Sequence, residues 1–428
     1  MAKSPTNAGT SETSEPAGSR AFLALLLALT FAMNTIGRGV TETFAVFLLP
    51  VEAALGATRS EITLSYSIYM LVHGVAAPFA GQLIDRLGAR ATYAAGLACL
   101  GAGYVLAGSA TAVWHYYVAA GVLGGLGAAC LGMVAASSLL SRWFSARLGS
   151  VMSVPYAAVG AGMLVIPPLT QLLLQAQGWR TTHLVIGWSV LALLPLLLVL
   201  PLERMTAGAQ EWRGRRADTI AEGAGLWTLR SALRTSAFWG MFGAYLGTAV
   251  AAYSVLPQTV AYLVEQGFDP LLAAAAFGMT GALSAVGIIA MGFISDRIGK
   301  VQAVTVSYIS SIAGTLSLLA VAWFPSLLLV YGFVVFFGIM QGVRGPVIVT
   351  MVATLYRGGA VGSIFGAMSL ALGLGAAIGS WLSAWLRDLT GAYAASFTLA
   401  VAGSLLGLAL FWGVGSLRNE RLDPGDKP

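Results

Sequence analysis

The chain has 428 residues, of which 57% are hydrophobic and only 9% are charged. Soluble domains carry about 25% charged residues, so this composition excludes a soluble globular protein. The apolar residues form continuous runs of about 20, which is long enough for a helix to cross a hydrocarbon core of about 30 Å. Because these runs lack the short alternating segments of a transmembrane β-barrel, we expect an all-α protein embedded in the lipid bilayer.

The sequence contains no motif for catalysis or cofactor binding. Cys99 and Cys130 lie inside apolar runs, which argues against a disulfide framework or a thiolate metal site. The basic residues form no stripe with interleaved aromatic residues, which argues against nucleic-acid binding. Nucleotide-binding loops, zinc-binding helices and nucleophile elbows are also absent. We therefore expect no enzyme activity, cofactor, metal or nucleic-acid partner.

Twelve hydrophobic spans follow one another along the chain. They cover residues 21–50, 62–84, 91–109, 113–140, 147–173, 182–201, 235–264, 270–294, 302–322, 326–355, 360–386 and 392–415. The longest polar stretch separates the first six from the last six. The expected units are a disordered tail at 1–19 that is not a cleaved signal peptide, an N-terminal half at 20–202, a linker at 203–234, a C-terminal half at 235–416 and a tail at 417–428.

The basic residues predict the orientation of the chain, because Lys and Arg collect in cytoplasmic loops. If both termini are cytoplasmic, that side holds 18 of the 23 basic residues, and the outer loops keep Arg59, Arg180 and Arg387. Arg38 and Arg344 then lie inside the membrane. The preference for Arg over Lys is typical of a GC-rich bacterial genome, so we expect a multi-pass protein of the bacterial inner membrane.

Two short patterns recur in the second half of the chain. Asp85-Arg86-Leu87-Gly88 recurs as Asp296-Arg297-Ile298-Gly299, shifted by 211 residues. A second echo, shifted by 213 residues, pairs Gly149, Ser150, Gly160 and Gly162 with Gly362, Ser363, Gly373 and Gly375. Such self-similarity predicts two parallel six-helix halves.

The first of these patterns resembles a family signature. Its residues are Gly81, Leu83, Asp85, Arg86, Gly88 and Arg90, with a degenerate copy at Gly292, Asp296, Arg297, Gly299 and Lys300. They resemble the loop motif of the major facilitator superfamily, which implies the twelve-helix fold of these transporters. An Asp next to an Arg at such a loop can pair with a neighbouring helix end and separate from it as the two halves rock.

The entry to the fifth span resembles one group within that superfamily. Its residues are Trp143, Phe144, Ser145, Arg147, Leu148, Gly149, Ala157, Gly160 and Gly162. They are similar to the monocarboxylate transporter and oxalate:formate antiporter group, which implies a small organic anion as substrate. That group commonly carries charged residues in spans eight and eleven, whereas here 270–294 and 360–386 are uncharged between their ends.

Three charged residues lie within the spans, where charges are costly and usually face a cavity. Asn34, Arg38, Thr41 and Glu42 share one helix face, and Arg38 and Glu42 are spaced to pair locally. Gln341 and Arg344 precede a Gly-Pro step that loosens the helix. The net charge of this buried set is +1 or +2, so it attracts an anion, and we expect Arg344 to clamp a carboxylate. Structural roles in an ion pair and in helix packing are the alternatives.

Glu42 and His73 are the candidates for proton coupling. A carboxyl group in a low-dielectric cavity beside Arg38 is open to changes of protonation when an anion arrives. His73 lies mid-span on the face of Ser65 and Tyr69, and histidine titrates near neutral pH. A hydrogen-bonded structural histidine is the alternative.

Several polar and aromatic residues fall at depths where they can line a cavity. Tyr69, Tyr156 and Gln258 are expected to contribute to the substrate site, and Tyr66, Tyr245, Tyr253 and Trp381 lie at similar depths. Packing and interfacial roles are the alternatives, because aromatic residues of membrane proteins often serve them.

These patterns together predict a secondary active transporter, monomeric, that moves a small organic anion, most simply a monocarboxylate, with protons by a rocker-switch mechanism. The rival transport functions are drug efflux, uptake of a larger aromatic or vitamin-like substrate, and anion antiport. A membrane-embedded enzyme lacks converging nucleophiles or metal ligands, and a receptor lacks a sizeable soluble domain.

Overall fold

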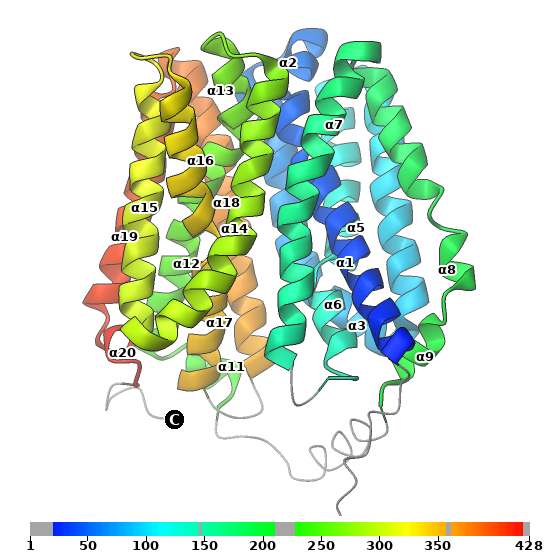
Figure 1. Ribbon diagram of the computed structural model, residues 1–428, viewed down its shortest axis with the longest axis vertical. Helices are drawn as coiled ribbons and strands as arrows, with labels where there is room; N and C mark the ends of the chain where they lie inside the picture. Colours follow the sequence, from blue (N-terminus) through cyan, green and yellow to red (C-terminus); the bar gives the residue numbers. More distant parts are fainter. Residues whose placement is uncertain (1–19, 145–147, 210–226, 357–360, 423–428) are drawn as a thin grey trace, which may run out of the picture.

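The computed structural model describes residues 20–144, 148–209, 227–356 and 361–422. The tail at 1–19, most of the linker, Ser145, Arg147 and the last six residues lie outside the described part. The described chain forms two helical bundles that stand side by side (Figure 1). The start of the first helix and the last helix lie at the same end, which we call the termini end; the opposite end is the distal end.

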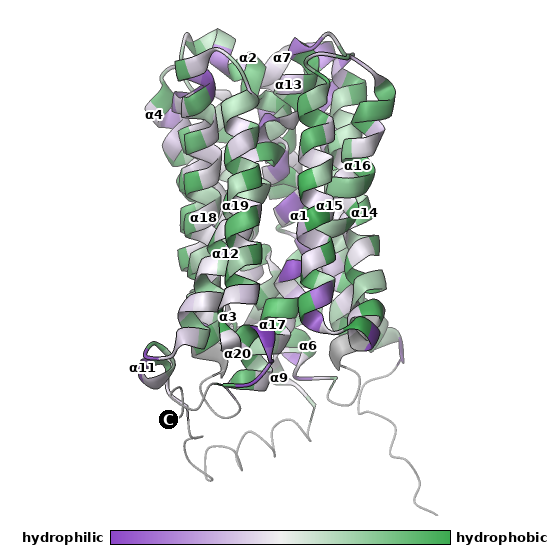
Figure 2. Cartoon of the chain, turned by 90° about the vertical axis from the view of Figure 1, so that its left-hand side faces the viewer, coloured by the Kyte–Doolittle hydropathy of each residue, from purple (hydrophilic) through white to green (hydrophobic). Residues whose placement is uncertain are grey.

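The N-terminal bundle is built from described residues between 20 and 207. Its helices are α1 (Arg20–Glu42), α2 (Phe44–Leu55), α3 (Arg59–Gly108), α4 (Val113–Tyr116), the π-helix η1 (Tyr117–Leu123), α5 (Gly124–Leu131), α6 (Met133–Leu140), α7 (Leu148–Leu191), α8 (Leu196–Val199) and α9 (Leu202–Ala207). Polar residues gather at the two ends of the molecule and around α1, while the outside of the helices is largely apolar (Figure 2).

The C-terminal bundle follows the linker. Its helices are α11 (Leu229–Ala232), α12 (Ser236–Val255), the 3-10 turn η2 (Leu256–Gln258), α13 (Thr259–Glu265), α14 (Pro270–Ile298), α15 (Lys300–Ala320), α16 (Leu327–Gln341), α17 (Arg344–Leu355), α18 (Val361–Thr390), α19 (Ala394–Gly413) and α20 (Gly415–Arg418). No strand occurs in the described residues, so the all-α prediction is confirmed for them.

Ten helical segments of the described chain are long and apolar enough to cross a membrane, which differs from the twelve predicted spans. Two of the ten are 50 and 49 residues long. At 1.5 Å per residue each of these exceeds twice the thickness of a hydrocarbon core. Each is broken by a glycine with positive φ, Gly88 (φ 84°) in α3 and Gly178 (φ 77°) in α7. Gly299, 211 residues after Gly88, has a similar backbone conformation (φ 89°).

Two of the predicted spans are interrupted close to candidate site residues. The first breaks between Glu42 and Phe44, where α1 ends and α2 begins, and another breaks between Gln341 and Arg344. Pro346 lies in the first turn of α17, where its missing N–H costs no helical hydrogen bond. Discontinuous helices leave backbone groups free at the middle of a bundle, which is where membrane transporters bind their substrates.

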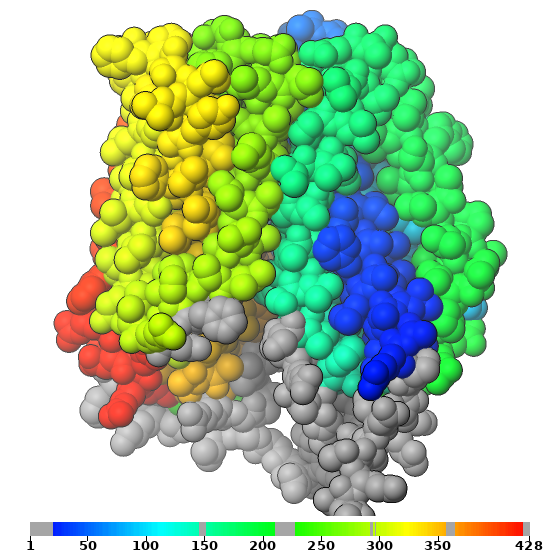
Figure 3. Space-filling model, in the orientation of Figure 1, coloured from blue at the N-terminus to red at the C-terminus, as the bar shows by residue number. Residues whose placement is uncertain are grey.

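The two bundles contact each other mainly where α7 packs on α14 and where α3 packs on α18. The surfaces of α7 and α14 lie directly against each other in the space-filling view (Figure 3). A Cβ atom added at Gly160 would lie 2.6 Å from the carbonyl oxygen of Gly281, and one at Gly373 would lie 3.1 Å from the Cα of Gly74. Glycines therefore bring the backbones together at both crossings.

We expect Gly373→Val to destabilise the protein. The added atoms meet the Gly74 backbone, and overpacking of this kind costs about 1–3 kcal/mol. The measurement is the thermal unfolding midpoint in detergent. Gly124→Ala is the control, because nothing lies within 4 Å of a Cβ at that helical position, and an unchanged midpoint for Gly373→Val would refute the close crossing.

Candidate functional site

Arg38 and Glu42 form the ion pair that their spacing of four residues predicts. They lie one turn apart at the end of α1, and the Arg38 Nη2 is 2.8 Å from the Glu42 Oε1. The Glu42 side chain is only 2% exposed, whereas the Arg38 side chain is 20% exposed. The pair is thus a buried carboxylate with a partly accessible guanidinium.

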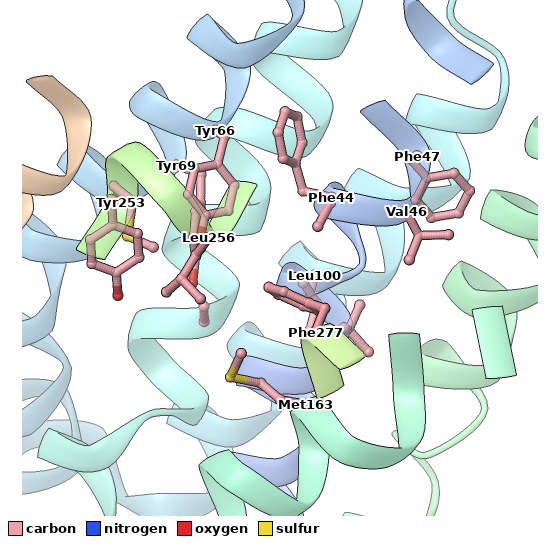
Figure 4. Close-up of a cluster of buried hydrophobic side chains, with 14 of the residues drawn as sticks. Phe44, Val46, Phe47, Tyr66, Tyr69, Leu100, Met163, Tyr253, Leu256 and Phe277 are labelled. Atoms are coloured by element: carbon pink, nitrogen blue, oxygen red, sulfur yellow. The ribbon is translucent and has the colours of Figure 1, made fainter. Parts of the chain in front are cut away.

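Three tyrosines surround this pair. The Arg38 guanidinium donates to the hydroxyl of Tyr69 at 3.1 Å and to the hydroxyl of Tyr253 at 2.5 Å, and Tyr66 donates to Glu42 at 3.2 Å. The rings of Tyr66, Tyr69 and Tyr253 lie next to one another (Figure 4). Tyr253 belongs to α12, so Arg38 joins the two bundles. We call Arg38, Glu42, Tyr66, Tyr69 and Tyr253 the central cluster.

A small cavity of about 20 Å³ adjoins the central cluster on the side of the N-terminal bundle. It is lined by Thr41, Phe44, Ser65, Tyr66, Tyr69, Tyr104, Tyr116 and Ala120. Six of these residues carry hydroxyl groups, and the volume is sufficient for about one water molecule. Tyr66, which contacts Glu42, therefore borders a small space that is accessible to several hydroxyl groups.

Arg344 lies apart from the central cluster, inside the C-terminal bundle. Its side chain is 1% exposed, its Nη2 donates to Ser311 at 2.7 Å, and its Cζ lies 4.7 Å from the centre of the Tyr308 ring. The Nε and Nη1 groups have no hydrogen-bond partner, and no acidic side chain of the described chain pairs with this guanidinium. Arg344 is therefore a buried cation with unused donors.

The remaining predicted site residues are dispersed. The Gln341 amide donates to the carbonyl of Thr280 at 3.5 Å, and Tyr156 is half-buried in α7. The ring of His73 lies 6.0 Å from that of Tyr69 and forms no hydrogen bond with any described residue. Gln258 is fully buried and contacts Arg59 rather than Arg38.

Arg59, expected in an outer loop, lies instead in the first turn of α3 and is 2% exposed. The reason is a capping box in which Thr58 and Glu61 satisfy each other's backbone N–H groups, so that the helix begins three residues before the predicted span. The sequence contains this signal as Thr58-x-x-Glu61, but nothing in it identifies the residues that Arg59 contacts.

The contacts of Arg59 form a network at the distal end of the molecule. Its guanidinium donates to Glu52 at 2.5 Å, to Glu265 and Tyr393 at 2.6 Å, and to Gln258 at 3.3 Å. The carboxylate of Asp388 in α18 accepts the backbone N–H groups of Arg59 and Ser60. We call Glu52, Arg59, Gln258, Glu265, Asp388 and Tyr393 the distal network.

The loop motif lies at the termini end, where it ties the N-terminal bundle together. Asp85 forms an ion pair with Arg142, which is 4% exposed and also donates to the carbonyls of Thr206 and Ser138. Arg90 pairs with Glu203 at 2.8 Å. A Cβ at Gly81 would lie 3.2 Å from Val134, so this glycine lets α6 approach α3.

The second copy of the motif is only partly described. The side chain of Asp296 lies outside the described residues, and Arg86 and Arg297 are exposed. Lys300 pairs with Glu420 at 3.0 Å, much as Arg90 pairs with Glu203. In both bundles a basic residue of the loop thus holds the segment that follows the last long helix.

We expect Arg142→Ala to lower the free energy of unfolding more than Arg90→Ala does. Loss of the buried Arg142 side chain leaves Asp85 without this ion-pair partner and two partly buried carbonyls without this donor, which costs about 1–3 kcal/mol. The Arg90–Glu203 pair is 39% and 84% exposed, and such pairs contribute about 0–1 kcal/mol. Thermal unfolding in detergent measures both, and equal effects would contradict this difference in burial.

Comparison with known proteins identifies the family. The model of the Major Facilitator Superfamily matches residues 23–343, which is more than half of the chain. The chain belongs to the Major Facilitator Superfamily. As a superfamily member it is a multi-pass membrane transporter and not an enzyme, and the predicted resemblance is confirmed.

Two relatives of this superfamily member are similar over most of their length. The uncharacterized MFS-type transporter YcxA of Bacillus subtilis is 27% identical over 353 residues, covering 80% of this chain and 82% of the relative. Monocarboxylate transporter 13 of Rattus norvegicus is 29% identical over 420 residues, covering 96% and 94%. The resemblance to this monocarboxylate transporter therefore extends over 96% of the chain.

A solved superfamily structure supports the fold. It is the crystal structure of a bacterial homolog of the human lysosomal transporter Spinster in an inward-facing, occupied conformation. The TM-score is 0.71 and the identity 13%, with 95% of this chain and 100% of that chain covered. At this identity the likeness concerns the fold alone.

Proposed function

We propose that this superfamily member transports a small organic anion, most simply a monocarboxylate, together with a proton. The observation that carries the proposal is the buried Arg344 guanidinium, in which two nitrogens, Nε and Nη1, have no hydrogen-bond partner and which has no acidic partner among the described residues. An uncompensated buried cation is costly, and a carboxylate that accepts two parallel hydrogen bonds relieves that cost. Its described neighbours, Ser311 and Tyr308, are uncharged, so an arriving anion displaces no acidic side chain of the described chain.

The central cluster supports a role for protons. While Glu42 is ionised it neutralises Arg38, so the pair offers no net charge to a second anion. When Glu42 is protonated, the Arg38 guanidinium is free to attract the substrate carboxylate. Proton binding and anion binding therefore favour each other in this arrangement, and Tyr253 transmits a change at Arg38 to the other bundle.

We assign the other predicted site residues supporting roles. Tyr69 orients Arg38, and Gln341 and Tyr156 line the path between Arg38 and Arg344. His73, which has no hydrogen bond within the described chain, is a second candidate proton carrier beside the central cluster. Gln258 belongs to the distal network and acts on the site through its own helix segment.

The proposed architecture is twelve membrane crossings in two halves related by a parallel repeat. The breaks at Gly88 and Gly178 divide two of the ten long segments into two crossings each. Both termini are then cytoplasmic, in a bacterial inner membrane, and the distal end is the outer side. We propose that a monomer works by rocking 20–202 against 235–416 about the glycine crossings, with 203–234 as the linker and the loop motif limiting the movement.

Uptake into proteoliposomes over a panel of carboxylates, with and without an inward proton gradient, tests this function. We expect saturable uptake of a small monocarboxylate that the gradient accelerates. The tyrosines of the central cluster favour an aromatic acid as the second candidate, so the panel includes one, together with a cationic dye. Transport of the dye alone would overturn the anion proposal. An uptake rate that is the same with and without the proton gradient would overturn proton symport.

A further inference from the structure

Arg59 is buried, with 2% of its side chain exposed, and its contacts differ from those of Arg38 and Arg344. Three of its four side-chain partners, Gln258, Glu265 and Tyr393, belong to the C-terminal bundle, whereas Glu52 belongs to its own bundle. Each of the four contacts is a hydrogen bond at 3.3 Å or less. The guanidinium therefore links the distal ends of the two bundles directly.

The Arg59 guanidinium holds two carboxylates of opposite bundles together. Glu52 and Glu265 come from opposite bundles and both contact this guanidinium. Without Arg59, the two carboxylates lose the cation that they share, and like charges at close range repel. The bonds of Asp388 to the backbone N–H groups at the start of α3 remain. Removal of one cation thus replaces the attraction at Glu52 and Glu265 with repulsion and weakens the link between the distal ends.

The distal network and the central cluster are carried by the same two chain segments. In the N-terminal bundle Glu42 and Glu52 lie ten residues apart on α1 and α2, or about 15 Å along the helix axis. In the C-terminal bundle Tyr253 contacts Arg38, and Gln258, five residues later, contacts Arg59. A displacement of Tyr253 by substrate is therefore passed along η2 to the distal network.

We propose that Arg59 is the gate residue of the outer side: it holds the distal ends of the two bundles closed in this state, and it must release Gln258, Glu265 and Tyr393 for that side to open. Gln258 is suited to a contact that breaks in each cycle, because its buried amide nitrogen has no hydrogen-bond partner even in the closed state. The coupling to the central cluster and the position of the distal end on the outer side rest on the proposed function, but the contacts that hold the distal ends together do not.

A cysteine probe between the bundles tests the gate. Ser380 is fully buried, and its hydroxyl lies 2.7 Å from that of Ser67 in the other bundle. Ser380→Cys is introduced into a chain whose two native cysteines are replaced by alanine, and intact cells are treated with a membrane-impermeant thiol reagent. We expect slow labelling with Arg59 present and labelling about tenfold faster or more with Arg59→Ala, since a buried charge pair is lost.

Arg387→Ala is the matched control. Arg387 also pairs with Glu265, at 3.4 Å, but both residues belong to the C-terminal bundle, so their pairing does not join the bundles. We expect labelling within about twofold of the parent, because this pair is 27% and 28% exposed and lies within one bundle, so its loss does not separate the bundles. A rise equal to that of Arg59→Ala would overturn the gate, since any loss of distal charge would then suffice.

Two further variants keep the test decisive if Arg59→Ala does not fold. Glu265→Gln removes one carboxylate of the gate with little change in shape, and Arg59→Lys keeps the charge but not the forked geometry. Both are expected to label faster than the parent and more slowly than Arg59→Ala. Unchanged labelling in both variants would overturn the proposal. Because labelling needs no substrate, failure of every carboxylate in the uptake panel would refute the anion proposal and leave this one standing.

Discussion

Arg344→Ala is expected to reduce saturable anion uptake by about 100-fold. The expectation follows from the isolation of this guanidinium, which is 1% exposed and pairs with no described acidic residue. Loss of a buried, doubly hydrogen-bonded charge contact costs about 2–5 kcal/mol, and each 1.4 kcal/mol is tenfold in affinity. The measurement is initial uptake into proteoliposomes over a range of anion concentrations.

Two variants show whether this effect is specific. Arg344→Lys keeps the charge but cannot offer the planar fork, so we expect only partial recovery of uptake. Arg180→Ala is the control, because Arg180 is equally cationic but donates to the carbonyls of Gly108 and Ala110 at a helix end of one bundle. Uptake by a folded Arg344→Ala protein at the level of the parent would remove Arg344 from the substrate site.

Glu42→Gln is expected to abolish accumulation driven by a proton gradient while it preserves exchange of labelled for unlabelled anion. The amide has nearly the shape of the carboxyl group and can still contact Tyr66, but it neither binds nor releases a proton. Arg38 is then permanently free to hold the anion, as it is when Glu42 is protonated. The measurement compares net uptake under an inward proton gradient with counterflow at equal pH on both sides.

His73→Gln separates the two proton candidates. His73 contacts the central cluster only through the edge of the Tyr69 ring, 6.0 Å away between centroids, so we expect its replacement to leave gradient-driven accumulation nearly intact. Loss of accumulation in His73→Gln with retention in Glu42→Gln would transfer the proton-carrying role to His73.

The local part of the site could be predicted from the sequence. A spacing of four residues places Arg38 and Glu42 on one helix face, and the ion pair follows from α-helix geometry alone. The Gly-Pro step after Arg344 likewise predicted a break in the helix, and the structure has that break just before Arg344. The all-α fold follows from apolar runs that cannot be buried in any other way within lipid.

The long-range part of the site could not be predicted in this way. The partners of Arg59 lie 206 residues away at Glu265 and 334 residues away at Tyr393, and no periodicity of the sequence relates such positions. The assignment of basic residues to the two sides of the membrane placed Arg59 in an outer loop. Its position next to a hydrophobic span fits that role as well as it fits a buried one. The same limit applies to Gln258, whose depth was predicted but whose contact with Arg59 was not.

The glycine crossings have a consequence for the speed of the transport cycle. Where Gly74 meets Gly373, backbone lies against backbone, whereas at the crossing of Gly160 and Gly281 the side chain of Met163 also packs against Gly281. Movement at the first crossing requires no change of rotamer and the flexible Met163 side chain can adjust at the second, so the middle of the interface offers little resistance. The height of the kinetic barrier is then set at the ends of the molecule, where Arg59 and the loop charges must exchange partners. Substitutions at these ends can therefore change the turnover rate without altering the substrate site.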